Sequence, residues 1–241
     1  MPYLSDNAIL TMAKAVEKLY YFKPPRVYLK AVKEMLCKLL SIKFGWKGKL
    51  LSRLLMSPVG GLLLSQIEKS EPSFAAFLKA IISMTIAVTI LRGGAKENVI
   101  PSECEAFADC RLLPGQDKDY AINLLKRALK QFEAVSIELV KYSKASLSPL
   151  DETFLSSIKS TMEAVLPNYA VDVTPLILPA SSDSRYLRQI GAIVYGFAPV
   201  SPELDYGELA RLAHGIDERI DVDSLVIMSK FLSLLPLRIR V

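Results

Sequence analysis

Histidine is almost absent from this chain, because His214 is the only one in 241 residues. Cysteine is scarce as well: Cys37, Cys104 and Cys110 form no CxxC pair. An odd number of thiols without paired spacing argues against a disulfide framework and against a cysteine zinc site. The same usage favours reduced thiols in a cytoplasmic protein.

Long apolar runs are also missing. Lys79 interrupts the most apolar window, residues 75–91. No stretch reaches the roughly 18–20 apolar residues of a transmembrane helix, so no membrane span is predicted. The first six residues have no basic segment followed by an apolar one, which argues against a signal peptide. A content of 51% hydrophobic and 23% charged residues is typical of a packed globular chain.

The net charge is +5, and the basic residues are spread along the chain rather than gathered in one stripe. Its densest basic cluster runs from Lys30 to Arg53 and is interleaved with Leu, Phe and Trp46. Such a pattern fits a surface for anionic lipid or nucleic acid, but more often it is a solvated helix face. We therefore do not predict nucleic-acid binding.

Hydrophobic periodicity predicts helices before strands in the first part of the chain. Ser5 or Asp6 is expected to cap a helix beginning at Asn7. Helical patterns continue from Val27 to about Ile67, with breaks at Gly45 and at residues 58–61, and look like an insertion. A strand (83–92), a strand (102–113), a helix from Asp117 or Asp119 and a strand (135–142) follow. This order is a ferredoxin-like unit without its first strand.

The second part of the chain reads as one side of an α/β layer. Residues 143–149 are mostly polar and form the linker candidate. The expected elements are a helix from Asp151 to Val165, a strand at 171–178, a short helix through Arg188, a strand at 192–197 and a helix capped by Asp221 or Asp223.

Three stretches, taken in order, resemble one family. The first combines Arg92-Gly93-Gly94, Asn98-Val99-Ile100-Pro101 and the segment Asp109 to Gly115. The second combines Ser182-Asp183-Ser184-Arg185-Tyr186 with Tyr195-Gly196-Phe197. The third is His214-Gly215-Ile216-Asp217. The first resembles the lid domain of the zinc aminoacylases, a metallopeptidase family that includes acetylornithine deacetylase and carboxypeptidase S. The others are similar to its late catalytic loop and to the stretch holding its last metal ligand.

This resemblance implies the fold and the chemistry. Residues 1–145 would form an α+β, ferredoxin-like lid and dimerisation domain, lacking its first strand and carrying a helical insertion at about 26–80. Residues 146–241 would be the C-terminal part of an α/β catalytic domain. The intact family uses two zinc ions to hydrolyse peptide or N-acyl amino acid amides, and its lid forms a homodimer.

The chain departs from the family in its metal site. The early His, the bridging Asp and the general-base Glu of these enzymes have no match here, and one His cannot build a dinuclear site. Met1-Pro2 followed by Asp6-Asn7-Ala8-Ile9 resembles what comes after a catalytic histidine of the lid. We therefore expect Met1 to correspond to an internal methionine of a longer enzyme, so that the chain is a C-terminal fragment and inactive alone. A split gene product with a separate N-terminal catalytic half, a wrongly assigned start and a pseudogene fragment all stay open.

Four residues are candidates for the site. By resemblance, His214 is a zinc ligand, Asn98 and Arg111 reach the substrate's amide and carboxylate, and Arg185 is a second carboxylate clamp. A planar guanidinium suits a carboxylate because two parallel N–H bonds fix its orientation. The simpler interpretations are an exposed Arg111 pair with Asp109 and helix capping around Asp183.

Two other functions stay open at this point. The chain could be a non-catalytic dimerisation or binding module derived from the lid, or a basic membrane-surface binder using Lys30 to Arg53.

Overall fold

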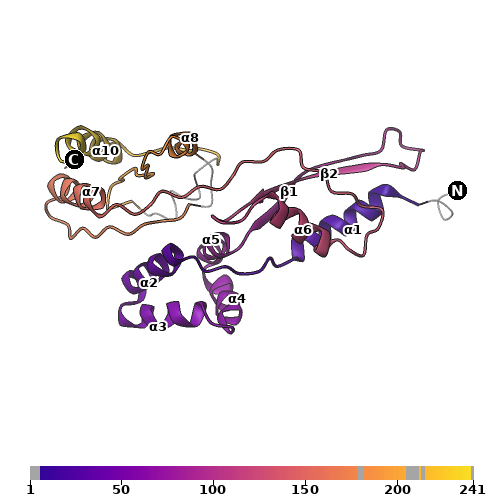
Figure 1. Cartoon of the computed structure of the whole chain (residues 1–241), viewed down its shortest axis with the longest axis horizontal. Coiled ribbons are helices and arrows are strands. Elements are labelled where there is room, and N and C mark those ends of the chain that lie inside the picture. Colours follow the sequence, from indigo (N-terminus) through magenta and orange to yellow (C-terminus); the bar gives the residue numbers. More distant parts are fainter. Residues whose placement is uncertain (1–5, 179–181, 205–211, 213–214, 240–241) are drawn as a thin grey trace. The chain divides into compact units, whose positions relative to one another are not determined.

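The computed structural model describes residues 6–178, 182–204, 212 and 215–239 (Figure 1). The chain divides into two compact units, Met1–Ser146 with Ile177–Ala180, and Leu147–Leu176 with Ser181–Val241. Helices dominate, and the described residues contain a single sheet of two antiparallel strands. This mixture confirms the predicted α+β class.

Helix α1 (Ala8–Tyr21) opens the first unit. Its cap is Asn7, whose Oδ1 accepts hydrogen bonds from the backbone N–H groups of Ile9 (3.0 Å) and Leu10 (3.4 Å). The cap predicted at Ser5 or Asp6 is therefore wrong by one or two residues. An Asn amide oxygen is among the best acceptors for the unpaired N–H groups of a first helical turn.

A hairpin of β1 (Thr85–Gly93) and β2 (Cys104–Arg111) forms the sheet. Ile86 pairs with Cys110 and Val88 with Ala108. The side chains of Ile86, Val88 and Cys110 pack against helices α1 and α6 (Lys118–Ala128), which is capped by Asp117 as predicted. One face of the hairpin is thus covered by helices, because alternate residues of each strand point to the same side of the sheet.

The helices predicted between residues 27 and 67 are confirmed as α2 (Lys30–Phe44), α3 (Trp46–Leu55) and α4 (Gly60–Ser70), and α5 (Pro72–Ile82) follows them. We call these four helices the insertion. Gly45, with φ of 60°, separates α2 from α3. The core of the insertion is apolar and buried. Its members are Val32, Met35, Leu36, Leu55, Leu64, Leu78, Ile81, Ile82 and Ile177.

Two glycines allow the helices of the insertion to approach closely. A Cβ at Gly48 would lie 2.1 Å from the carbonyl oxygen of Leu40, so α3 rests directly on the backbone of α2. A Cβ at Gly60 would lie 1.9 Å from the carbonyl oxygen of Leu55. Neither position has a positive φ, so here glycine is required for space rather than for backbone freedom.

The second unit is built on helices α7 (Glu152–Val165), α8 (Ser184–Gln189) and α10 (Val222–Leu234), with a 3₁₀ turn at Leu235–Leu237. Asp151 and Asp221 cap α7 and α10 as predicted. Ile158, Met162 and Phe231 form its buried core.

Three predicted strands are absent, and each has a local reason. In 171–178, Pro175 lacks the N–H that a ladder needs, and Val171 and Val173 pack on the core instead. In 192–197, Ser148 holds both backbone groups of Val194. In 135–142, no described strand lies alongside to complete a ladder.

Among the described residues, no single helix is long and apolar enough to cross a membrane. Helices α3 and α4 reach that length and composition only as a pair, which is bent by 119°.

Candidate functional site

Asn98 lies in the loop that connects β1 to β2, and its side chain is exposed. The loop turns at Gly94, which has φ of 80°, and at Val99, whose N–H donates to the carbonyl of Lys96 (3.3 Å). Asn98 therefore precedes β2 in the chain.

Arg111 ends β2 on the face of the hairpin away from α1 and α6. Its Nε donates to Oδ2 of Asp109 at 2.6 Å, and both side chains are about half exposed. This is the exposed pair that the sequence left open as the simpler interpretation. Because the bond uses only Nε, the terminal N–H groups of the guanidinium still offer a flat, two-pronged edge of the kind that binds a carboxylate.

The hairpin keeps Asn98 and Arg111 apart. Arg111 pairs with Thr85 at one end of the sheet, and Cys104 pairs with Gly93 at the other, next to the loop that holds Asn98. Eight strand residues at about 3.4 Å each separate the two ends by more than about 20 Å. One chain therefore does not bring these two side chains to the same small substrate.

Arg185 lies in the first turn of α8, in the second unit. Its Nη2 donates to the hydroxyl of Tyr186 at 2.6 Å, and its guanidinium carbon lies 4.6 Å from the centre of that ring. Asp183 makes no side-chain capping bond to α8, so capping does not explain Arg185.

A hydrogen-bond network that the sequence did not reveal joins the start of the second unit to the segment after α8. Ser148 Oγ donates to the carbonyl of Val194 (2.8 Å) and accepts from Val194 N (3.0 Å) and from Arg188 Nε (2.9 Å). Tyr195 Oη donates to the carbonyl of Pro149 (2.8 Å) and accepts from Asp151 N (2.7 Å). Nothing in the spacing of these residues signals contacts across 40 to 46 positions.

His214 lies outside the described residues. In the part of its stretch that is described, Asp217 adopts φ of 62°, a left-handed conformation that Asp tolerates better than most residues. The described residues contain no group of three or more His, Cys, Asp or Glu side chains arranged to hold a metal ion. They therefore do not form a zinc site on their own, and zinc is connected to this chain only through the prediction for His214.

Cys110 is the ionisable group beside Arg111 with a shifted pKa. Burial raises the pKa of its thiol, and the neighbouring Asp109 carboxylate raises it further. A thiol in that environment stays protonated at neutral pH, so it is a poor nucleophile and a poor metal ligand.

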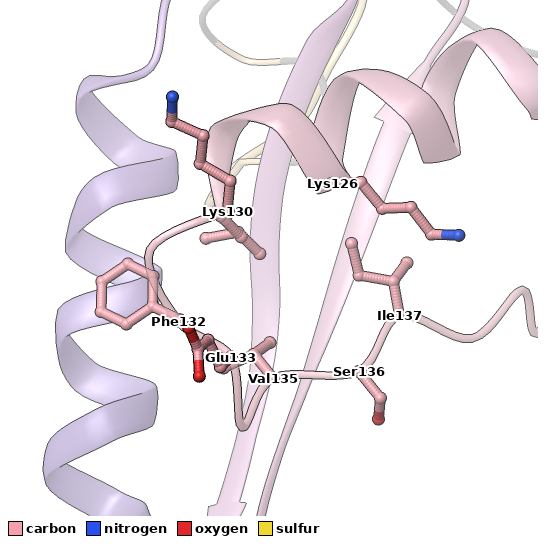
Figure 2. A pocket seen from close by; sticks show the side chains of 8 residues that line it. Lys126, Lys130, Phe132, Glu133, Val135, Ser136 and Ile137 are labelled. Atoms are coloured by element: carbon pink, nitrogen blue, oxygen red, sulfur yellow. The ribbon is translucent and has the colours of Figure 1, made fainter.

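A cavity of about 400 Å³ lies between the end of α6 and the segment that follows it (Figure 2). Phe132, Val135 and Ile137 line it together with Lys126 and Lys130, and Phe132 also packs against α1. None of the four predicted site residues lines this cavity. It adjoins the segment where the strand 135–142 was expected.

The first unit matches a known domain. Residues 1–135 match the Peptidase dimerisation domain of the M20 peptidases. No solved structure matches the chain.

Known relatives extend the match into the second unit. An N-fatty-acyl-amino acid synthase/hydrolase of Danio rerio is 30% identical over 91% of this chain and 41% of its own length. A probable carboxypeptidase S-like protein of Dictyostelium discoideum is 30% identical over 66% of the chain and 29% of its own length. Aminoacylase-1B of Rattus norvegicus is 29% identical over 48% of the chain and 29% of its own length.

The chain spans less than half the length of the curated relatives it matches. The resemblance noted in the sequence is nevertheless confirmed, because the matched domain covers more than half of the chain. By its dimerisation domain and its relatives, the chain belongs to the M20 peptidase family of hydrolases.

Proposed function

We propose that this chain supplies the dimerisation domain and the last part of the active site of a zinc-dependent amide hydrolase. The observation that carries the proposal is the match of residues 1–135 to the dimerisation domain, continued to 91% of the chain by the zebrafish relative. The relatives are named as an N-fatty-acyl-amino acid hydrolase, a carboxypeptidase and an aminoacylase. Enzymes with these names all cleave an amide bond and release an amino acid. The proposed substrates are therefore N-acyl amino acids or peptides.

His214 is the zinc ligand of this chain in the proposal. A neutral imidazole binds zinc through one nitrogen, and a hydrogen bond to the other nitrogen fixes its orientation. Bound zinc supplies Lewis-acid activation of water and of the amide carbonyl in such hydrolases. The remaining ligands and the general base come from polypeptide outside this chain, because one histidine cannot complete the site.

Arg111 binds the free carboxylate of the substrate. Asp109 already holds its guanidinium through Nε, which fixes the direction of the side chain before the substrate arrives. The two terminal nitrogens of Arg111 then face the substrate carboxylate, and binding costs little additional side-chain conformational entropy. The open face of the hairpin leaves room for this approach.

Asn98 and Arg111 serve different active sites of a homodimer. Their separation along the hairpin exceeds the length of an amino acid, so one lid domain reaches two sites when two chains associate. This arrangement gives the dimerisation domain a direct role in substrate binding.

Mixed dimers test this arrangement. The chain is co-expressed with an N-terminal half from the zebrafish relative, and hydrolysis of an N-acyl amino acid is measured. Asn98→Ala and Arg111→Ala variants are expected to be nearly inactive separately. When the two are refolded together, half of the dimers are mixed, and each mixed dimer has one site with both native side chains. About a quarter of the native activity should then return.

Failure of the mixture to regain activity would contradict the shared site. A chain that stays inert with every N-terminal half, while still forming dimers, would instead indicate a non-catalytic dimerisation module.

A further inference from the structure

Helix α3 presents a narrow apolar stripe to the solvent. Trp46, Leu50 and Leu54 are 77%, 55% and 40% exposed. They are spaced four residues apart, so each lies only about 40° around the helix axis from the one before. We call these three side chains the α3 stripe. Large apolar side chains that adjoin one another on a surface mark a place where something binds.

Cations flank the α3 stripe on both sides. Lys49 and Arg53 follow one edge and Lys47 the other, and all three are exposed. Lys47 Nζ lies 5.8 Å from the centre of the Trp46 ring. Among the described residues, none of the three cations forms an ion pair with a carboxylate.

The charge of the whole protein is concentrated in this region. Residues 35–67 contain five basic residues and no acidic one, whereas the rest of the chain contains 25 basic and 25 acidic residues. The net charge of +5 is therefore the charge of this segment alone. A surface potential localised in this way steers anionic partners to α3.

The fold fixes which side of α3 faces outward. Gly48, Ser52 and Leu55 form the opposite side and are buried. Gly48 rests on the backbone of α2, and Leu55 belongs to the core of the insertion. The helix cannot turn its stripe inward without breaking these contacts.

We propose that the α3 stripe and its cations dock this protein onto an anionic lipid membrane, with α3 lying parallel to the surface. Trp favours the boundary between headgroups and acyl chains, Leu inserts just below it, and the long stems of Lys and Arg let their charges reach lipid phosphates. This inference is independent of the proposed catalytic function.

Two other occupants fit the surface less well. A second copy bound through the same face would place cations against cations. A nucleic acid would meet the cations, but it offers no apolar layer for Leu50 and Leu54. Ile42 on α2 and Leu62 on α4 are further exposed large apolar residues of the insertion.

Trp46 makes the test direct, because it is the only tryptophan in the chain. The full chain is titrated with vesicles of phosphatidylcholine alone and with vesicles containing phosphatidylglycerol. We expect a blue shift of the tryptophan emission and quenching by brominated acyl chains with the anionic vesicles only, and both should weaken as salt is raised.

Variants locate the surface by vesicle flotation. Lys49→Gln with Arg53→Gln should lower vesicle affinity about 25-fold, since each cation near anionic lipid contributes about fivefold. Trp46→Ala with Leu50→Ser should abolish flotation. Matched controls lie on α1: Lys14→Gln with Lys18→Gln removes the same charge, and Tyr20→Ala removes an exposed aromatic ring. These should bind like the native chain, and circular dichroism checks that every variant is folded.

The proposal is overturned if the native chain ignores anionic vesicles, or if the α1 controls lose as much binding as the α3 variants. It is also overturned if the Trp46 emission shifts with protein concentration alone, which would indicate self-association. A shift produced by RNA but not by vesicles would assign the surface to nucleic acid.

Discussion

Arg111 and Asp109 show why residue type alone does not define a site. Their same-strand pair was one of two interpretations left open by the sequence, because alternate residues of a strand share a face. An exposed ion pair contributes only about 0–1 kcal/mol to stability, so stability gives little reason for an Arg at this position. Ligand binding would give a better reason.

Replacing Arg111 with Lys in the reconstituted enzyme tests that role. Loss of the two-pronged contact should lower kcat/KM about 10–100-fold, since a charge-assisted pair contributes about 1.5–3 kcal/mol. The control is an amide-capped substrate without the carboxylate, on which both enzymes should perform alike. An equal loss on both substrates would refute the carboxylate contact.

Tyr195 is a residue whose role only the structure reveals. Tyr195→Phe keeps the stacking with Phe154, whose ring centre is 5.2 Å away, but removes both hydrogen bonds to the backbone around Pro149. The free energy of unfolding should fall by about 1–3 kcal/mol in urea denaturation, because two polar backbone groups lose their partner. Tyr20→Phe, at an exposed tyrosine, should change it by less than about 0.5 kcal/mol.

At the scale of elements, helices were predicted more accurately than strands. Three helices carry a start signal in their own sequence: Asp151 caps α7 as predicted, and Asp117 and Asp221 are each one of the two caps predicted for α6 and α10. A strand depends on a neighbour that sequence does not identify. Segment 192–197 has a strand-like composition, yet Ser148, far away in the chain, takes the hydrogen bonds that a neighbouring strand would need.

Gly48 and Gly61 form a matched test of helix packing in the insertion. Gly48→Ala would place a Cβ 2.1 Å from a backbone oxygen of α2, so we expect a loss of at least about 3 kcal/mol of stability. Gly61→Ala meets only the end of the Arg26 side chain at 3.9 Å, and should stabilise α4 by up to about 1 kcal/mol. If Gly48→Ala melted like the native chain, the close contact of α2 and α3 would be disproved.

The contact of α4 with α5 should depend on pH. Lys79 Nζ donates to Glu68 Oε1 at 2.6 Å, and this bond lowers the pKa of the Glu68 carboxyl below its ordinary value near 4.5. The stabilisation is fully present above that ordinary pKa and is lost as pH falls through the lower folded-state pKa.

Thermal melts between about pH 6 and pH 3 should therefore show a steeper loss of stability for the native chain than for Glu68→Gln. Parallel curves would mean that the ion pair is not formed in solution.

At the scale of the whole molecule, the family could be identified from sequence, but the geometry of the site could not. Three motifs in the same order along the chain, beginning with Arg92-Gly93-Gly94, indicated the family, and the match to the M20 dimerisation domain confirms it. That Asn98 and Arg111 lie at opposite ends of a hairpin depends on strand register, which resemblance does not supply. The proposed zinc ligand, His214, lies outside the described residues, so the metal site in our proposal depends on sequence resemblance alone.

The most direct test measures zinc content and amide hydrolysis when this chain is combined with an N-terminal half that carries the other ligands. The proposal predicts that hydrolysis of an N-acyl amino acid returns with bound zinc, and that His214→Ala abolishes the hydrolysis and lowers the zinc content without unfolding the protein. Restored hydrolysis that is unchanged in the His214→Ala variant would contradict the proposal.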